Sequence, residues 1–184
     1  MPLLSKELKR ELFGWAKVIV FAVVIAWLLQ SFVIVNASVP TGSMQNTIDA
    51  KSRVVAFRLA YMFSDPERYD IVVFKFPDDE SQLYVKRVIG LPGETVSIIG
   101  GKVYINGSEK PLNSDFVKEP PLLYDYGPYV VPEDCYFVLG DNRNGSVDSR
   151  AWVNKFVRKD KILGEVKFCY FPQLKWYDNS VPGE

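Results

Sequence analysis

A serine and a lysine stand in segments that suit a nucleophile and its base. Ser43 follows Pro40 and Gly42, and glycine permits a close backbone approach beside the serine. Lys86 lies in Tyr84–Ile89, an apolar segment of strand-forming residues. A neutral lysine can take the proton of a serine hydroxyl, which requires its pKa to fall from ~10.4 towards ~8. Because apolar surroundings disfavour the ammonium ion, the two segments together suggest a hydrolase with a Ser-Lys dyad.

The composition restricts the chemistry further. The chain has 184 residues and no histidine, which excludes a Ser-His-Asp hydrolase, a Cys-His protease and any histidine-ligated metal site. Its 22 basic and 22 acidic residues give a formal net charge of zero, which argues against a nucleic-acid-binding protein. Its two cysteines, Cys135 and Cys169, are too few for a cysteine-rich zinc site, and they could either pair or remain buried thiols. We therefore expect no metal, no cofactor and no nucleic-acid partner.

Taken singly, each segment also has an ordinary structural explanation. Serine and glycine beside proline are common in linkers, and cations such as Lys86 and Arg87 protect edge strands from aggregation. Strand alternation places Lys86 and Arg87 on opposite faces, so one of them must point among apolar neighbours. A third segment, residues 138–150, runs from an apolar strand into a loop with two Asp, two Arg, two Asn and two Ser. Such a loop can be a long turn held by side chains, and it lacks the ligand spacing of an EF-hand.

The N-terminal part contains a segment long and apolar enough to cross a membrane. No charged residue lies between Lys17 and Asp49, and Val18–Leu29 is uninterrupted apolar sequence. A helix over residues 15–35 would be ~31 Å long, which matches a bilayer core. A secretory signal cleaved near Ala37 and a buried helix are alternatives, but the apolar run is longer than the usual hydrophobic core of a signal peptide. We therefore predict a transmembrane helix over residues 15–35.

The charges that flank this segment predict its orientation. Four basic residues and two acidic residues stand before or at its start, namely Lys6, Lys9, Arg10 and Lys17 against Glu7 and Glu11. By the positive-inside rule, residues 1–14 lie in the cytoplasm and residues 36–184 lie outside. No second long apolar run follows. The expected localisation is the cell membrane, crossed once, with an extracytoplasmic domain.

Residues 36–184 have the composition of an antiparallel β-domain. Segments rich in Val, Ile, Phe and Tyr alternate with turns that contain Gly and Pro. The expected strands are Arg53–Phe57, Asp70–Phe76, Tyr84–Ile89, Thr95–Ile99, Lys102–Ile105, Cys135–Leu139 and Ile162–Tyr170. Residues 108–132 are expected to be an extended insertion and residues 173–184 a loosely held end. The predicted fold is therefore mainly β, a transmembrane helix followed by an antiparallel sheet or barrel-like domain.

In this order, four segments resemble the motifs of the bacterial type I signal peptidases. They are Val39–Met44 (VPTGSM), Tyr69–Phe74 (YDIVVF), Tyr84–Glu94 (YVKRVIGLPGE) and Gly140–Arg150 (GDNRNGSVDSR). The resemblance runs from the apolar anchor through Tyr170, and the short chain with one anchor is similar to the small Gram-positive type. It implies a serine endopeptidase of the signal peptidase fold.

The resemblance also implies catalytic roles. It makes Ser43 the nucleophile and Lys86 the general base. It makes Ser146 the residue that hydrogen-bonds and orients this lysine, and it places Thr41 with the backbone N–H of Ser43 in an oxyanion hole. The chain departs from the family at Thr41, where serine is commoner, which leaves the oxyanion geometry less defined than the nucleophile.

Structural and substrate-binding roles follow from the same resemblance. It implies structural ion pairs among Asp141, Asp148 and Arg150, with Arg87 as the partner of Asp141. By alignment, Val39, Tyr84 and Val85 fall in the substrate groove. Two further departures lie outside the dyad, Asn46 in place of proline and Glu94 in place of aspartate.

The implied substrates are secretory preproteins, cut at small-x-small sites while their signal peptides are still in the bilayer. Membrane lipids are the second expected partner, and Leu59, Tyr61, Met62 and Phe63 are candidates either for lipid contact or for the core. The chain's own sequence at Ala37 resembles such a cleavage site. A related Ser-Lys peptidase with a different substrate and an inactive membrane-anchored binding domain are the rival interpretations.

Overall fold

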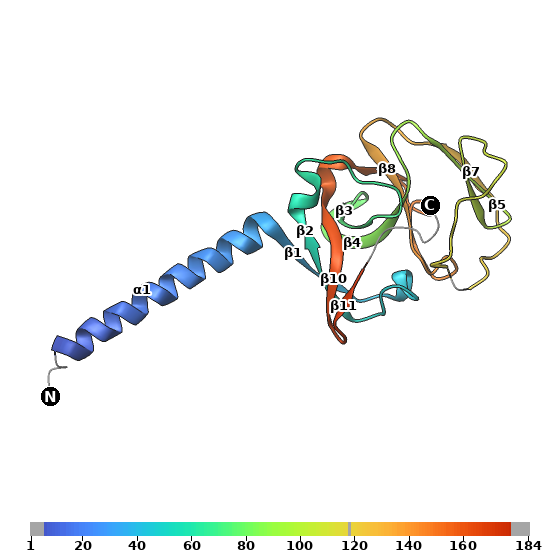
Figure 1. The fold of residues 1–184 in the computed structure, drawn as a ribbon. Helices are drawn as coiled ribbons and strands as arrows, with labels where there is room; N and C mark the ends of the chain where they lie inside the picture. The colour runs from blue at the N-terminus through green and yellow to red at the C-terminus, as the bar shows by residue number, and fades with distance from the viewer. Residues whose placement is uncertain (1–5, 118, 178–184) are drawn as a thin grey trace.

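The fold consists of one long N-terminal helix and a β-rich domain, as Figure 1 shows. The computed structural model describes residues 6–117 and 119–177. Helix α1 covers Lys6–Leu28 and continues as a π-helical turn, η1, over Leu29–Val33. None of the residues of α1 is buried, and the helix extends away from the β-domain (Figure 1). A helix that exposes apolar side chains on all sides fits a lipid environment rather than a protein core.

The helix ends earlier than the sequence analysis predicts. Ile34 and Val35 belong to strand β1, Ile34–Val39, so the prediction of a helix through Val35 is wrong. The physical reason is a change of period: Val35, Ala37 and Val39 alternate with exposed residues and are buried in the core. Cleavage after Ala37 would remove the first four residues of β1, which pair with β2. The β-domain thus includes residues that a cleaved signal would take away.

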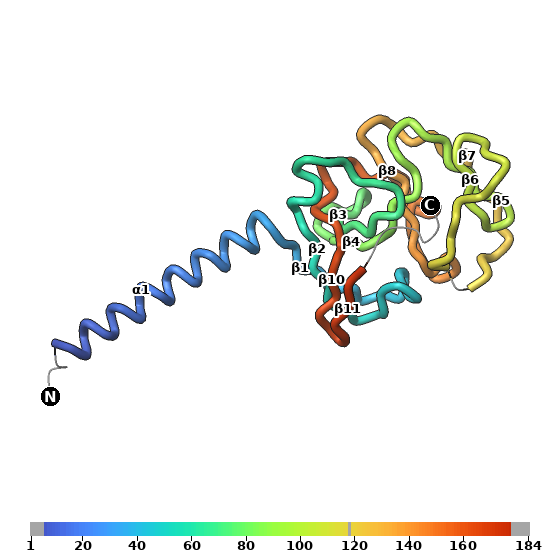
Figure 2. The backbone as a smooth tube through the Cα atoms, in the orientation of Figure 1, coloured from blue at the N-terminus to red at the C-terminus, as the bar shows by residue number. Residues whose placement is uncertain are grey.

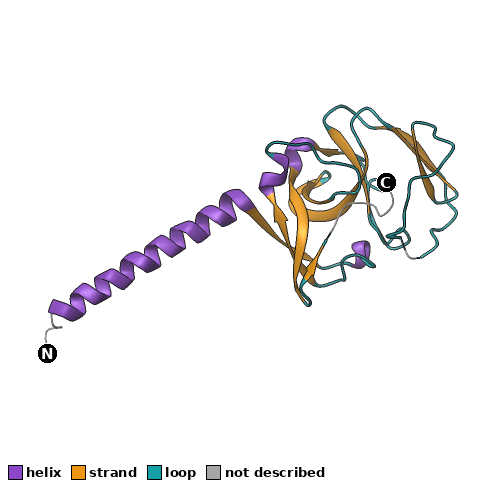
Figure 3. Ribbon diagram, viewed as in Figure 1, coloured by secondary structure: helices purple, strands orange, loops and turns teal. Residues whose placement is uncertain are grey.

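Eleven strands and three 3₁₀ turns follow the helix in the described part of the chain. After β1 and η2 (Gly42–Met44), they are β2 (Ser52–Phe57), η3 (Arg58–Tyr61), β3 (Ile71–Phe76), β4 (Asp79–Gly90), β5 (Thr95–Ile99), β6 (Lys102–Ile105), β7 (Tyr126–Val130), β8 (Cys135–Leu139), β9 (Val157–Arg158), η4 (Lys159–Lys161), β10 (Ile162–Phe171) and β11 (Lys175–Trp176). All the strand pairs are antiparallel. Strands dominate the domain in Figure 3, so the prediction of a mainly β fold behind one apolar helix is confirmed.

The strands form two sheets. The larger has the order β1-β2-β10-β3-β4-β8-β9, with β11 beside β10, and the smaller has the order β6-β5-β7. In the backbone tube of Figure 2, the small sheet lies at the end of the domain opposite α1. Three strands lie between β1 and β4 in the order of the large sheet. Val39 of β1 and Val85 of β4 nevertheless belong to one buried cluster, which shows that the large sheet curls. This curl brings the end of β1 next to the middle of β4.

The expected strands correspond closely to the observed ones, with several additions. The ranges of β5, β6 and β8 are the predicted ones, whereas β4 begins five residues before Tyr84. The predicted insertion at residues 108–132 contains β7, and the predicted loose end contains β11 and the buried Tyr177, with residues 178–184 lying outside the described residues. Cys135 and Cys169 are free thiols on β8 and β10.

Candidate active site

The first component of the site is a tight turn that follows β1. Pro40 ends the strand, and Gly42–Met44 forms the 3₁₀ turn η2, in which Ser43 is 6% exposed. Met44 is fully buried beside Ser43 and packs in the same cluster as the core residues of β1. Ser43 is therefore fixed on one side by the buried side chain of Met44 and on the other by the end of strand β1, which pairs with β2.

The second component is Lys86 in the middle of β4. Its Nζ lies 2.6 Å from Oγ of Ser43, a hydrogen bond that the ammonium form donates to the hydroxyl. The lysine is 3% exposed, and burial is the main cause that lowers its pKa to about 8. Asp148 and Asp141 raise this pKa, and Arg150 lowers it slightly. When Lys86 loses its proton, its lone pair can accept the hydroxyl proton of Ser43 across the same short distance.

The aromatic ring of Tyr84 lies beside Lys86, and further aromatic rings pack on Tyr84. Nζ lies 5.6 Å from the ring centroid of Tyr84, which stacks on Phe76 at 4.4 Å and meets Trp152 edge-on at 6.1 Å. Phe74 contacts the rings of Tyr84 and Trp152. These rings provide few polar groups to replace water, so they contribute to the desolvation that favours the neutral amine.

A groove passes across the dyad between β1 and β4. Its volume is about 360 Å³, and it is lined by Ser38, Val39, Pro40, Thr41, Ser43, Gln82, Leu83, Tyr84, Val85, Lys86, Gly145 and Val147. All three residues assigned to substrate binding by alignment are among them. The hydroxyl of Thr41 lies 3.4 Å from Oγ of Ser43, on the exposed side of the turn. The groove can therefore bring an extended peptide to Ser43 with a hydroxyl donor beside the attacked carbonyl.

The polar loop, residues 140–150, is held by two buried ion pairs. Arg87 binds Asp141 through two hydrogen bonds of 2.8 and 2.7 Å, and Arg150 binds Asp148 through two of 2.7 and 2.8 Å. Both carboxylates are fully buried. The four residues that the resemblance assigned to structural ion pairs thus form two pairs, of which Arg87 with Asp141 is the combination that the resemblance implied.

Asn142 joins this loop to the turn η2, which carries Ser43, and was not singled out from the sequence. Its backbone N–H donates to the carbonyl oxygen of Ser43 at 3.1 Å, and its side-chain amide donates to that of Gly42 at 3.0 Å. Its Oδ1 accepts the N–H of Gly145 at 2.9 Å. The sequence shows two asparagines in this loop, and asparagine in a polar loop usually indicates a turn. No local feature of the sequence indicates that Asn142 binds a residue 100 positions away.

The sequence that forms this site matches a known protein family. The model of the family described as "Signal peptidase, peptidase S26" matches residues 12–171, which include most of α1, the turn η2 that carries Ser43, β4 and the polar loop. The chain belongs to the signal peptidase family. The predicted activity, a serine endopeptidase that removes signal peptides, is confirmed by this membership.

Individual members of the signal peptidase family match over most of their length. Signal peptidase I of Bacillus amyloliquefaciens is 40% identical over 171 residues, 89% of this chain and 90% of that protein. Signal peptidase I S of Bacillus subtilis strain 168 is 38% identical over 172 residues, 89% of this chain and 91% of that protein. The crystal structure of a signal peptidase I from Enterococcus faecalis V583 is 36% identical, covers 55% of this chain and 97% of that chain, and has a TM-score of 0.47.

Ser146 differs from its expected arrangement in this family member. Its Oγ is buried without a hydrogen-bond partner in the described part of the chain, so the expected hydrogen bond to Lys86 is not formed. Gly145 and Val147, on either side of it, line the groove, while Ser146 lines a cavity behind the loop.

Gly140, in the polar loop, has no room for a side chain. A methyl group there would overlap the carbonyl oxygen of Ser43 and the side chain of Ser146. We expect Gly140→Ala to displace the turn η2 and to lower kcat by about 10²-fold, as small misplacements of reacting groups do. Cleavage of a preprotein measures this loss. Gly14→Ala is the matched control, because nothing lies within 4 Å of the added methyl group, and equal rates for the two variants would contradict the steric role.

No group of three or more Cys, Asp or Glu residues that could hold a metal ion occurs within residues 6–117 and 119–177.

Proposed function

We propose that Ser43 and Lys86 are the catalytic dyad with which this protein cuts signal peptides from preproteins. The observation that supports it is the 2.6 Å contact between Nζ and Oγ in a buried site where the lysine pKa falls to about 8. Neutral Lys86 takes the hydroxyl proton while Oγ attacks the carbonyl carbon of the bond to be cut. The backbone N–H of Ser43 and the hydroxyl of Thr41 stabilise the oxyanion that forms.

The remaining steps return the enzyme to its starting state. The tetrahedral intermediate collapses, the C–N bond breaks, and the Lys86 ammonium gives its proton to the departing amine. Lys86, neutral again, then takes a proton from water, which attacks the ester carbon. The ester bond breaks, Oγ of Ser43 recovers a proton, and the signal peptide leaves with a free carboxylate.

The groove determines which peptide is presented to the dyad. We expect the residues before the cut to lie extended between β1 and β4, with Val39, Tyr84 and Val85 in contact with their side chains. Val39 and Val85, which are 4% and 6% exposed, give the groove an apolar lining that suits small apolar side chains such as alanine. The proposal therefore includes cleavage after small-x-small sequences.

Ser146 remains the residue proposed to position Lys86. Its hydroxyl would reach Lys86 after a change of the Ser146 rotamer.

The helix places this site at the membrane. We propose that it spans the bilayer once with residues 1–14 in the cytoplasm and the β-domain outside, because basic residues precede the apolar run. Confinement to the surface that holds the signal peptide raises the effective substrate concentration. Met62 and Phe63 follow η3, are 62% and 90% exposed, and are candidates for lipid contact.

Protease added to intact spheroplasts should digest the β-domain, because the proposed orientation places this domain outside the membrane. Protection of the β-domain from the protease would contradict the orientation.

The pH dependence of cleavage tests the role assigned to Lys86. Because the neutral amine is the active form, kcat/KM should rise with pH through a midpoint near 8 and fall about tenfold per unit below it. A peptide with an Ala-x-Ala site, assayed between pH 6 and 10, provides the measurement. Lys102→Met, at the exposed start of β6, should keep this midpoint. A rate that is independent of pH, or that falls over this range, would contradict a lysine base.

A further inference from the structure

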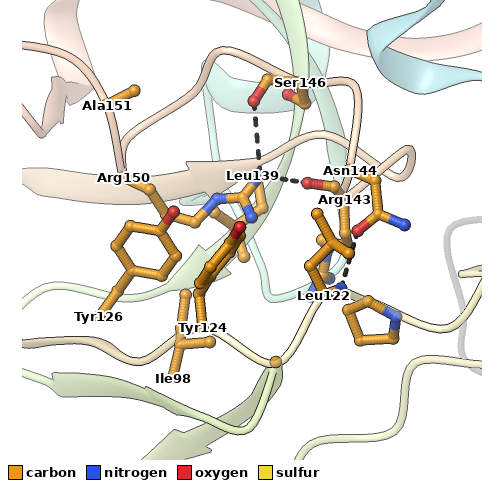
Figure 4. Close-up of a pocket in the computed structure, with 12 residues that line it drawn as sticks. Ile98, Leu122, Tyr124, Tyr126, Leu139, Arg143, Asn144, Ser146, Arg150 and Ala151 are labelled. Atoms are coloured by element: carbon orange, nitrogen blue, oxygen red, sulfur yellow. Dashed lines mark hydrogen bonds between the residues drawn. The ribbon is translucent and has the colours of Figure 1, made fainter.

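A cavity with an uncompensated positive charge lies behind the polar loop. Its volume is about 130 Å³, and Arg143, Asn144, Ser146 and Arg150 line it from the loop. Leu122, Tyr124 and Tyr126 line it from the opposite side, as Figure 4 shows. The groove that contains the dyad is lined by Gly145 and Val147, so the cavity and the groove are separated by the loop itself.

Arg143 is the unusual residue of this cavity. It is 7% exposed, and its Nη2 is buried without a hydrogen-bond partner among the described residues. Its Nε donates to the carbonyl oxygen of Gly140 at 3.1 Å, and its guanidinium lies 5.7 Å from the ring centroid of Phe116. Burial lowers its pKa to about 10, so it still carries its charge at neutral pH. A buried charge without a counter-charge costs several kcal/mol, so such groups are normally paired.

The nearby carboxylates are already occupied. Asp141 is bound at both oxygens by Arg87, and Asp148 at both oxygens by Arg150. Within the described residues, neither these two nor any other carboxylate forms an ion pair with Arg143. Three guanidinium groups thus stand against two carboxylates in one buried region, an excess of one positive charge among these five side chains. The ammonium form of Lys86, which interacts with the same two carboxylates, adds to this excess.

The cavity also supplies neutral hydrogen-bonding groups. The hydroxyl of Ser146 is buried and unpartnered, and Tyr124 and Tyr126 belong to the same lining. Asn144 joins the segment that carries Leu122 to the polar loop: its Oδ1 accepts the N–H of Leu122 at 2.9 Å (Figure 4). Its Nδ2 donates to the carbonyl oxygen of Pro120 at 3.1 Å. Asn144 thus fixes one wall of the cavity to the polar loop.

We propose that this cavity is a binding site for one small monovalent anion, such as a halide or a short carboxylate, bound by Arg143 and Ser146. The charge of the ligand follows from the three arginines and two carboxylates, and its size follows from the cavity volume. Bound there, the anion stabilises the face of the polar loop that is turned away from the dyad. The two proposals share only Ser146, whose hydroxyl faces the anion in the rotamer described here and would leave it on turning towards Lys86. Arg143 is the ligand that belongs to the anion site alone, so the test below addresses Arg143.

Thermal unfolding of the full-length protein in detergent tests the proposal. The unfolding midpoint is measured in sodium chloride and in sodium gluconate at equal ionic strength, since gluconate is too large for the cavity. Chloride should raise the midpoint saturably by a few degrees, as expected for a ligand of the native state. Arg143→Met should lose this rise, while Arg158→Met, at an arginine side chain that is 70% exposed, should keep it. Because the two salts also differ non-specifically, the diagnostic quantity is the difference between wild type and Arg143→Met.

A second measurement needs no variant. Crystals of the wild-type protein soaked in bromide should show an anomalous peak in the cavity, within hydrogen-bond distance of Nη2 of Arg143. Bromide confined to the protein surface, or a chloride effect of equal size in wild type and Arg143→Met, would overturn the proposal and leave a cavity that holds water. Both readouts are independent of proteolysis, so failure of the dyad mechanism would not affect them.

Discussion

Cleavage of a preprotein with an Ala-x-Ala site should fall by about 10²–10⁴-fold when Lys86 is replaced by methionine. Methionine has a similar volume and can lie beside the Tyr84 ring as Lys86 does, but it cannot accept the proton of Ser43. Ser43→Ala should be at least as damaging, because it removes the attacking atom. The purified variants, incubated with the preprotein and followed by the appearance of mature protein, provide the measurement.

Two further variants separate a base from a mere positive charge. Lys86→Arg keeps the charge but cannot deprotonate, so it should be as inactive as Lys86→Met. Lys102→Met removes an exposed lysine and should cleave like wild type. If Lys86→Arg retained most of the activity, the role of residue 86 would be electrostatic, and the mechanism proposed here would be wrong.

The two members of a dyad should also act as one unit. The double variant Ser43→Ala/Lys86→Met should lose no more activity than the worse of the two single variants, as in other catalytic groups that work together. Losses that multiply would show that Ser43 and Lys86 contribute independently. Such a result would conflict with proton transfer across their 2.6 Å contact.

The chemistry of the site was more predictable from the sequence than its supports. Alternation along Tyr84–Ile89 places Lys86 and Arg87 on opposite faces, which suggests that one of the two is buried. In the structure both are, at 3% and 4% exposure, because the polar loop covers one face and the turn η2 lies on the other. A single strand shows its own period, but it does not show what later segments place upon it.

The main errors have the same origin. The start of β1 continues the apolar run of the anchor, and only pairing with β2 distinguishes a buried strand residue such as Val35 from a membrane residue. Asn142 and Ser146 lie in a loop whose composition indicates turns, and their contacts are with residues distant in sequence or with a cavity. Short strands with hairpin glycines, β5 and β6, were predictable because their partners are adjacent in the chain.

Loss of the Asp141 carboxylate should be the most destabilising change in the polar loop. Asp141 and Arg87 are 0% and 4% exposed, and Asp141→Ala would leave the Arg87 guanidinium buried without its partner. Breaking a buried pair from one side costs about 3–5 kcal/mol. Denaturant unfolding of the detergent-solubilised protein measures this as a lower midpoint. Asp160→Ala is the matched control, because its pair with Arg158 is exposed and should be worth less than about 1 kcal/mol.

A double variant shows whether the cost comes from the unpaired charge. Asp141→Leu combined with Arg87→Met removes both charges and keeps apolar bulk, so it should recover a large part of the stability that Asp141→Ala loses. The loop would still contain Arg143, Arg150 and Asp148, and thus keep its excess of one positive charge. Asp141→Ala alone would increase that excess to two. If the double variant were as unstable as Asp141→Ala, lost packing rather than uncompensated charge would account for the effect.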